Sequence, residues 1–191
     1  MRIAGILLAA GAAARFGGDK LLARLDDGTT IGVRSCTNLL ASVPEVIAVT
    51  RAGDDVLMRE LAAAGAHVTV CADANAGMGA SLAHGVRSAG DANAVIVALA
   101  DMPWILASTI TAVAGELRRG ASLVAPRYHG MRGHPVGFAR VHFAALTALG
   151  DDAGARDLIA RLKDIRWIDV DDPGVLRDVD TPADLSPQRA S

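Results

Sequence analysis

The sequence predicts an α/β protein, with a mostly parallel, mixed sheet that carries helices on both faces. Over the first two-thirds of the chain, apolar runs of strand length alternate with segments of helical period, which is typical of β-α units. The 191 residues are 51% hydrophobic and 21% charged, so the chain is too apolar to be disordered and long enough to bury a full core. We therefore expect one domain that spans residues 1–191.

Apolar runs and glycine stops place the elements of the first part of the chain. Strands are expected at residues 2–8, 45–49, 67–71 and 94–99, and helices at residues 30–41, 54–64 and 80–89. The helical segments show helical spacing or are rich in the helix-favouring residues Ala, Leu, Met and Glu, and Gly65 and Gly90 end two of them. A further helix is expected from about Ser108, whose hydroxyl can cap it, to Arg119 before Gly120.

The last third of the chain is less regular and predicts that the sheet is mixed. Strands are expected at residues 123–125, 135–138 and 165–170, and helices at about 141–148 and 157–162. A turn-rich segment, residues 128–133, separates the first two of these strands. Only the tail after Leu185 is expected to be frayed.

Charge and cysteine content exclude several classes of function. The 19 Lys and Arg residues against 21 Asp and Glu give a net charge of -2, so the chain lacks the basic field that attracts nucleic acids or anionic membranes. Cys36 and Cys71 have no spacing that builds a disulfide framework or a zinc site. Residues 3–14, after Arg2, have the outline of a secretory signal peptide, but the run also fits a buried strand that enters a loop at Gly11. No segment reaches the roughly 20 apolar residues of a membrane span, and we expect a cytoplasmic protein with neither nucleic acid nor membrane as partner.

Small residues and two cations follow the first predicted strand. In open α/β sheets, ligands bind beyond the carboxyl ends of the strands, and here the segment runs Leu8-Ala9-Ala10-Gly11-Ala12-Ala13-Ala14-Arg15-Phe16-Gly17-Gly18-Asp19-Lys20. The small side chains let backbone N–H groups approach a phosphate, and Arg15 and Lys20 supply positive charge. The segment predicts an anion cradle, although it contains neither a Walker P-loop nor a dinucleotide fingerprint. A flexible Gly/Ala turn with two solvated cations fits the same residues.

Two carboxylates are candidates for a metal site. Asp101 comes directly after the apolar run at residues 94–100, and Pro103 stiffens the turn that follows. A carboxylate at the carboxyl end of a buried strand suits Mg²⁺ that bridges substrate phosphates, although a helix N-cap or loop aspartate fits the same position. Asp180 is the candidate for a second ligand, while Asp178 and Asp184 could equally flank or cap a short helix that begins at residue 182.

Together, these stretches resemble the molybdenum-cofactor nucleotidyltransferases of the MobA-like NTP transferase superfamily. The resemblance runs from Ile6 to Leu185. The family pattern L-A-[AG]-G-x-x-x-R-x-G-x-x-K corresponds to residues 8–20, and its D-x-P turn to residues 101–103. Stretches that look like the remaining signatures lie at residues 77–82, 133–136, 150–156 and 178–182.

The resemblance implies a single-domain, Rossmann-like nucleotidyltransferase fold, in which residues 1 to about 105 bind the nucleotide and the later part binds a second substrate. Its implied nucleotide-binding residues are Leu8, Ala9, Ala10, Gly11, Arg15, Lys20, Gly77, Gly79, Ser81 and Asp101. Arg15, Lys20 and Asp101 are the implied catalytic residues, with Asp101 and Asp180 as the Mg²⁺ ligands. Arg132, Gly133, His134 and Arg156 are expected to face the second substrate. Gly77 and Gly79 could instead only start a helix, and His134 could be a turn histidine.

The implied activity is the transfer of CMP from CTP to the phosphate of molybdopterin or the molybdenum cofactor, with Mg²⁺ and with release of pyrophosphate. Ala10 looks like the cytidylyltransferase branch, because the guanylyltransferase branch usually has a second glycine there. Ala13 departs from relatives that often have serine, so a hydroxyl contact to phosphate is missing. A molybdoenzyme is an implied recipient. Use of GTP, a sugar-phosphate acceptor, or a non-catalytic molybdenum-cofactor carrier are the alternatives.

Overall fold

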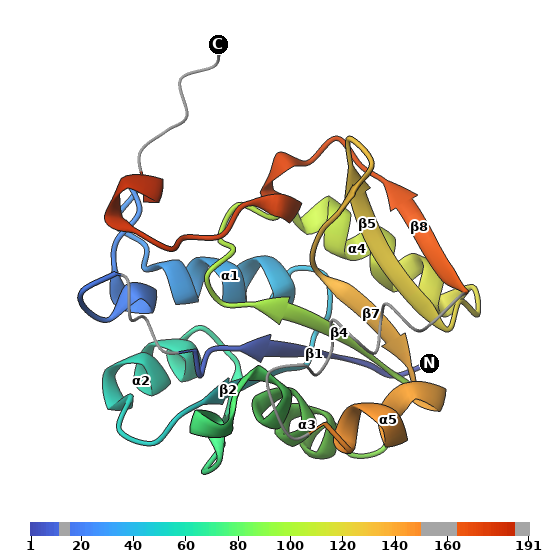
Figure 1. The fold of residues 1–191 in the computed structure, drawn as a ribbon, viewed down its shortest axis with the longest axis horizontal. Coiled ribbons are helices and arrows are strands. Elements are labelled where there is room, and N and C mark those ends of the chain that lie inside the picture. The colour runs from blue at the N-terminus through green and yellow to red at the C-terminus, as the bar shows by residue number, and fades with distance from the viewer. Residues whose placement is uncertain (12–15, 150–163, 186–191) are drawn as a thin grey trace.

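In the part of the chain that the structure describes, eight strands form one central sheet (Figure 1). The computed structural model describes residues 1–11, 16–149 and 164–185. Its strands are β1 Ile3–Leu8, β2 Val46–Thr50, β3 His67–Val70, β4 Ala94–Leu99, β5 Leu123–Tyr128, β6 Met131–Arg132, β7 Val136–Ala139 and β8 Ile165–Asp169. The strand order is β3-β2-β1-β4-β7-β5-β6, and β8 pairs with β5. These bounds confirm the predicted α/β class, and β4 has the predicted limits.

Helices cover both faces of this sheet. The α-helices are α1 Ile31–Leu40, α2 Asp55–Ala63, α3 Met78–Ser88, α4 Ala107–Arg118 and α5 Phe143–Thr147. Short 3₁₀ helices are η1 Lys20–Leu22, η2 Ala74–Ala76, η3 Arg140–His142, η4 Pro173–Leu176 and η5 Pro182–Leu185. None of the helices in the described ranges is long and apolar enough to cross a lipid bilayer.

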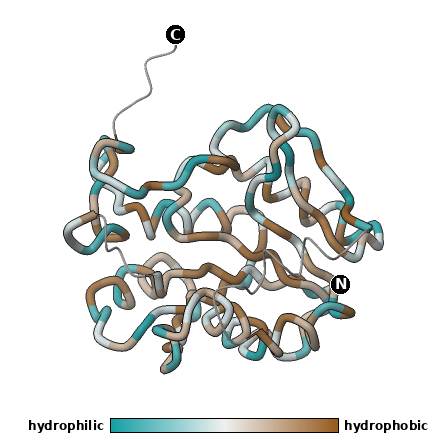
Figure 2. Tube along the Cα trace, viewed as in Figure 1, coloured by the Kyte–Doolittle hydropathy of each residue, from teal (hydrophilic) through white to brown (hydrophobic). Residues whose placement is uncertain are grey.

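Alternation along the strands divides the core into two halves. Leu7 on β1 packs in one half with residues of α1, α2 and α4, whereas its neighbour Ile6 packs in the other half with residues of α3. Successive side chains of a strand point to opposite faces, so a strand that is apolar throughout must be buried on both sides. Figure 2 shows this as hydrophobic colour along the central strands.

The sheet is parallel in its first half and mixed in its second. β1 pairs in parallel with both β2 and β4, and Leu8 lies opposite Leu99 in the register of β1 and β4. The loops after these two strands therefore leave the same edge of the sheet side by side, at the point where the strand order reverses direction. β7 is antiparallel to both β4 and β5, which confirms the predicted mixed sheet.

The predicted cap of α4 is wrong. Its N-cap residue is Leu106, without a side-chain cap, and Ser108 lies inside the helix. The carboxylate of Asp172, 66 residues away, accepts the hydrogen bond of the Leu106 N–H at 3.0 Å. A buried acceptor from elsewhere in the fold thus binds the N–H of the N-cap residue, and no side chain caps the helix in the way expected of Ser108.

One predicted helix is shorter in the structure, and another lies outside the described residues. The helix expected at residues 141–148 is shorter in the structure, where η3 leads into the five-residue helix α5. The helix expected at residues 157–162 and the tail after Leu185 lie outside the described residues.

Candidate active site

Three charged side chains from distant parts of the chain meet at the carboxyl edge of the parallel strands. The Nζ atom of Lys20 lies 2.8 Å from Oδ2 of Asp101 and 3.6 Å from Oδ1 of Asp180. The side chain of Lys20 is 13% exposed, that of Asp101 24% and that of Asp180 44%. In Figure 1, the C-terminal 3₁₀ helix η5 lies beside the loop that contains η1. The structure therefore brings together three of the residues that the sequence nominated from separate motifs.

Lys20 is held by apolar residues that follow it. It is the first residue of η1, and Leu21 and Leu22 pack against the core half that contains α1. The backbone N–H of Ile31 donates to the carbonyl of Ala23 at 3.0 Å, which ties the end of η1 to the start of α1. The loop thus returns to the sheet edge with Lys20 directed at Asp101.

Polar side chains of α1 hold the loop that carries Asp101. Ser35 Oγ donates to the carbonyl of Ala100 at 2.9 Å. Asn38 Nδ2 donates to the carbonyls of Pro103 and Ile105, at 2.9 and 3.0 Å. These bonds satisfy backbone groups that the turn would otherwise leave unpaired. Sequence reasoning did not nominate Ser35 and Asn38 as positioning residues, although their spacing places both on one helix face.

Asp180 is held through the backbone on either side of it. The N–H of Val179, a fully buried residue, donates to the carbonyl of Asp101 at 2.9 Å. Oδ2 of Asp184 accepts from the N–H groups of Asp180 and Thr181 at 3.1 and 2.7 Å, and from the Thr181 hydroxyl at 2.9 Å. The bonds from Thr181 and Asp180 lower the pKa of the Asp184 carboxyl. Asp184 thus caps this turn, one of the two roles that the sequence left open for it.

The chemistry of the three side chains fits a divalent cation. One ammonium faces two carboxylates, which leaves a net negative charge, and Oδ1 of Asp101 is buried with no hydrogen-bond partner among the described residues. Mg²⁺ with a bound nucleotide often takes only one or two carboxylates, because phosphates and water complete its shell. Within the described residues, no group of three or more His, Cys, Asp or Glu could hold a metal by itself. The site fits a metal that arrives with phosphates.

The start of the predicted anion cradle, residues 8–11, offers only backbone groups to a ligand. Leu8, Ala9 and Ala10 are buried, and Gly11 is exposed. The N–H of Ala9 donates to the carbonyl of Val49, and the carbonyl of Leu8 accepts from Ala100, so these two groups are already used inside the sheet. Ala13 and Arg15, both singled out in the sequence, lie outside the described residues.

The glycine-rich stretch near residue 77 begins α3. Gly77 is the N-cap residue and has a φ of 121°, a conformation that favours glycine. Gly79 and Ser81 are buried on the helix, with Ser81 4% exposed. The helix-start role that the sequence allowed for Gly77 is thus observed, and a contact to a nucleotide base stays a prediction.

Of the expected second-substrate residues, the structure describes three. Arg132 ends the short strand β6, and Gly133 and His134 follow it. The N–H of Gly133 donates to the carbonyl of Pro126 and that of His134 to the carbonyl of Val175, both at 2.9 Å. Arg156 and the rest of the motif at residues 150–156 lie outside the described residues.

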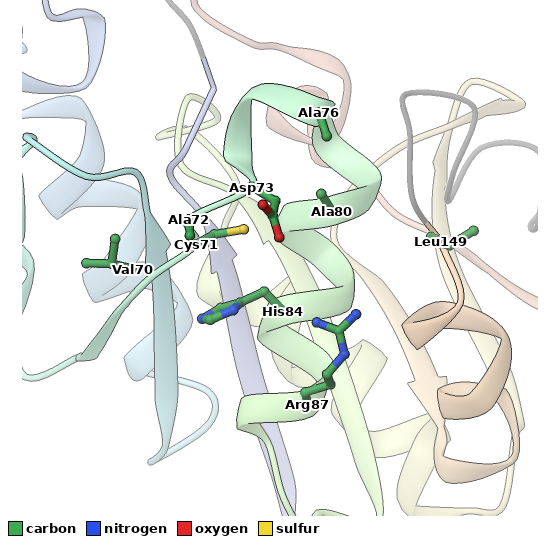
Figure 3. A pocket seen from close by; sticks show the side chains of 9 residues that line it. All are labelled: Val70, Cys71, Ala72, Asp73, Ala76, Ala80, His84, Arg87 and Leu149. Carbon is green, nitrogen blue, oxygen red and sulfur yellow. The ribbon is translucent and has the colours of Figure 1, made fainter.

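A separate pocket of about 400 Å³ lies along α3 (Figure 3). Asp73, His84 and Arg87 contribute polar groups to it, and Cys71 and small apolar side chains complete its wall. The His84 ring is held by the Thr69 hydroxyl at 2.8 Å. Lys20, Asp101 and Asp180 do not line it, so this pocket is distinct from the three charged residues.

The comparisons with known proteins agree with this fold. The model of the MobA-like NTP transferase domain matches residues 5–165, so the chain belongs to this family of nucleotidyltransferases. Nicotine blue oxidoreductase of Paenarthrobacter nicotinovorans is 31% identical over 191 residues, which cover 94% of this chain and 92% of that protein. The purine catabolism protein PucB of Bacillus subtilis (strain 168) is 31% identical over 192 residues, covering 93% and 91%.

Solved structures share the fold over nearly the whole chain. The crystal structure of Rv0371c from Mycobacterium tuberculosis H37Rv is 28% identical, has a TM-score of 0.83 and covers 96% of this chain and 94% of that one. A second structure of Rv0371c is a complex with manganese, with a TM-score of 0.77, 24% identity and 96% of each chain covered.

Proposed function

We propose that the chain transfers CMP from CTP to the terminal phosphate of molybdopterin, or of its metal-loaded form, and releases pyrophosphate in a Mg²⁺-dependent reaction. The observation that carries this proposal is the convergence of Lys20, Asp101 and Asp180 beside the loop after β1. Nucleotidyl transfer needs positioning and charge neutralisation more than a protein nucleophile. An ammonium and two carboxylates at the switch point of a parallel sheet supply these functions.

Asp101 and Asp180 would hold the metal. Its chemistry, when it is bound, is to neutralise charge on the phosphate oxygens of the nucleotide. In the described part of the chain, Oδ1 of Asp101 has no hydrogen-bond partner, and the bond from Val179 to the Asp101 carbonyl keeps the two acidic residues together. The manganese complex of Rv0371c supports a divalent metal for this site.

Lys20 and Arg15 would bind the β- and γ-phosphates. In the reaction, an oxygen of the acceptor phosphate forms a bond to the α-phosphorus of CTP, and the bond from that phosphorus to the bridging oxygen of the β-phosphate breaks. The leaving pyrophosphate takes the electron pair of the broken bond. Lys20 lies where it can move from the carboxylates to this pyrophosphate and stabilise its charge.

The choice of CTP rests on Ala10 and on the signatures at residues 77–82 and 133–136, and the choice of acceptor rests on sequence motifs. Ala10 is buried, and the guanylyltransferase branch usually has glycine at this position. The motifs at residues 133–136 and 150–156 resemble those of the molybdenum-cofactor nucleotidyltransferases. Residues 1 to about 105 would bind the nucleotide, and the later part of the chain would bind the acceptor. The reaction would take place in the cytoplasm.

The test is a panel of the four NTPs with purified protein, Mg²⁺ and molybdopterin, read as pyrophosphate release and as the dinucleotide product. We expect CTP to be used best. Preference for GTP would reassign the donor, and turnover with a sugar phosphate alone would reassign the acceptor. Tight cofactor binding without nucleotide turnover would favour a carrier. Reduction or oxidation of a substrate without pyrophosphate release would instead align the chain with its relative named as an oxidoreductase.

A further inference from the structure

The segment that carries Asp180 is held by hydrogen bonds and packing contacts at several points along its length. We call residues 172–184 the C-terminal strap. We propose that the Gly133–His134 turn acts on the reaction through this strap, by seating it so that Asp180 faces Lys20 and Asp101. Gly133 is then a positioning residue of the metal–triphosphate site. This inference rests on the proposed function for the role of Asp180.

The turn and the strap are in direct backbone contact. A Cβ atom added at Gly133 would lie 2.5 Å from the carbonyl oxygen of Val175 and 2.6 Å from its Cβ. Real Cβ atoms do not approach backbone this closely, so only glycine lets the strap sit here. Gly133 does not have a positive φ. The glycine is therefore required for space and not for backbone conformation.

The backbone N–H groups of the turn serve this contact. His134 N–H donates to the Val175 carbonyl, and Gly133 N–H donates to the Pro126 carbonyl on β5. A backbone N–H is a single donor. Neither N–H is therefore free to bind a phosphate of the acceptor, the substrate that these residues were expected to face. What the pair does in the structure is connect β5 to the strap.

Further anchors fix the strap before and after Val175. Oδ2 of Asp172, a residue that is 2% exposed, accepts from Leu106 N–H at 3.0 Å and from the Thr109 hydroxyl at 2.7 Å. The Arg177 guanidinium stacks on the Trp104 ring, with its carbon 3.5 Å from the ring centroid. These contacts tie the strap to α4 and to the loop after Asp101.

Only three residues separate Val175, which the turn contacts, from Val179, which binds the loop that carries Asp101. Val175 is held by His134, and Val179 donates to the carbonyl of Asp101, immediately before Asp180. Such a short segment, with both ends fixed, transmits a displacement at Val175 to Asp180. Groups that orient metal ligands in this way change metal affinity without touching the metal.

The test measures metal–nucleotide binding without any acceptor. In Gly133→Ala we expect the affinity for Mn²⁺ with CTP, measured by electron paramagnetic resonance, to fall by about 10- to 100-fold. Gly115→Ala is the matched control, because its added Cβ would only meet the Arg119 side chain at 3.5 Å. Wild-type affinity in Gly133→Ala would overturn the proposal, since a residue that served only the acceptor would give that result.

A second pair of variants keeps the test valid if Gly133→Ala does not fold. Asp184→Ala removes the three bonds that hold Asp180 and Thr181 at the exposed end of the strap, and we expect the same loss of Mn²⁺ affinity. Asp178→Ala, an exposed neighbour on the strap, is its control and should bind as wild type. Equal affinity in the two variants would contradict the proposal.

Hydrogen exchange separates this proposal from the proposed function. The amide of Val179 donates to Asp101, and we expect its exchange to accelerate in Gly133→Ala and not in Gly115→Ala, with no nucleotide present. If the wild type turns over no NTP, the proposed function fails, but faster exchange at Val179 still supports the seating of the strap. If the wild type turns over CTP but exchange at Val179 is unchanged in Gly133→Ala, the proposal about the strap is overturned and the proposed function stands.

Discussion

The Nζ atom of Lys20 donates to Oδ2 of Asp101 at 2.8 Å, although 81 residues separate them. The bond joins the segment after β1 to the loop after β4, two strands that are neighbours in the sheet. Oδ1 of Asp180 lies 3.6 Å from the same ammonium nitrogen. The site is therefore made by the topology of the sheet, and each of the three side chains can be tested separately.

Replacing Asp101 should impair chemistry without unfolding the protein. In Asp101→Asn we expect turnover to fall by about 10²-fold or more, the scale seen when a main electrostatic stabiliser of a transition state is lost. Circular dichroism should be unchanged. Asp178→Asn is the control, because this exposed carboxylate lies near Asp180 in sequence. Turnover close to that of wild type in saturating Mg²⁺ would reject the role of Asp101.

Replacing Lys20 should affect both binding and turnover of the nucleotide. Lys20→Ala removes the ammonium that faces the two carboxylates, so we expect a higher KM for CTP together with a lower kcat. Arg24→Ala, an exposed cation of the same segment, should leave both constants unchanged. An effect of Lys20→Ala on neither constant would move the triphosphate to another part of the molecule.

Removing divalent cations should abolish turnover and leave the fold intact. Excess EDTA should stop pyrophosphate release, because two carboxylates and one ammonium cannot by themselves neutralise a triphosphate. Added Mg²⁺ or Mn²⁺ should restore it, and the circular dichroism spectrum should not change. Full turnover in the presence of excess chelator would contradict the metal role of Asp101 and Asp180.

The strap should be intolerant of a side chain at Gly174. A Cβ atom there would lie 2.2 Å from the carbonyl oxygen of Trp104. We expect Gly174→Ala to lower the free energy of unfolding by roughly 1–3 kcal/mol, the usual cost of overpacking, as measured by urea denaturation. Gly115→Ala on α4 should be neutral or slightly stabilising. Equal stability of the two variants would show that the strap is not packed as described.

The two cysteines should differ in reactivity. Burial raises the pKa of Cys36 to about 11, so its thiol is neutral at pH 8 and should resist iodoacetamide. Cys71 lines the pocket along α3 and should react first, as followed by mass spectrometry. Above pH 9 the unfolded thiol loses its proton while the native one keeps it, so stability should fall between about pH 9 and 11. This dependence should weaken in Cys36→Ala, and an unchanged slope would assign it to other groups.

Much of the fold and the centre of the site can be predicted from the sequence, because both follow from the parallel strands. The apolar run that forms β4 has the predicted limits, and the alternation of strands and helices predicts which loops share an edge. Lys20 and Asp101 each follow such a strand, so their meeting follows from topology. The prediction of Asp180 depended on its sequence motif as well, because no parallel strand leads directly into this residue.

The supporting residues could not be predicted, because they act over long distances in sequence. The N–H of Leu106 donates to the carboxylate of Asp172, which is 66 residues away. The sequence around the helix start shows only the nearby hydroxyl of Ser108 and gives no sign of this distant acceptor. The close approach of Gly133 to Val175 could not be predicted from the sequence either. There, the motif that contains Gly133 indicated a loop that faces the second substrate. Such contacts depend on how the elements pack against one another. The periodicity of hydrophobic residues predicts the elements but not their packing.

The most direct test is a crystal structure of the protein with Mn²⁺ and a non-hydrolysable CTP analogue, in which anomalous scattering locates the metal. We predict that the metal is bound by carboxylate oxygens of Asp101 and Asp180 and by phosphate oxygens, with Lys20 in contact with the triphosphate. A complex in which the metal and nucleotide are bound but Asp101 lies beyond coordinating distance would contradict the account.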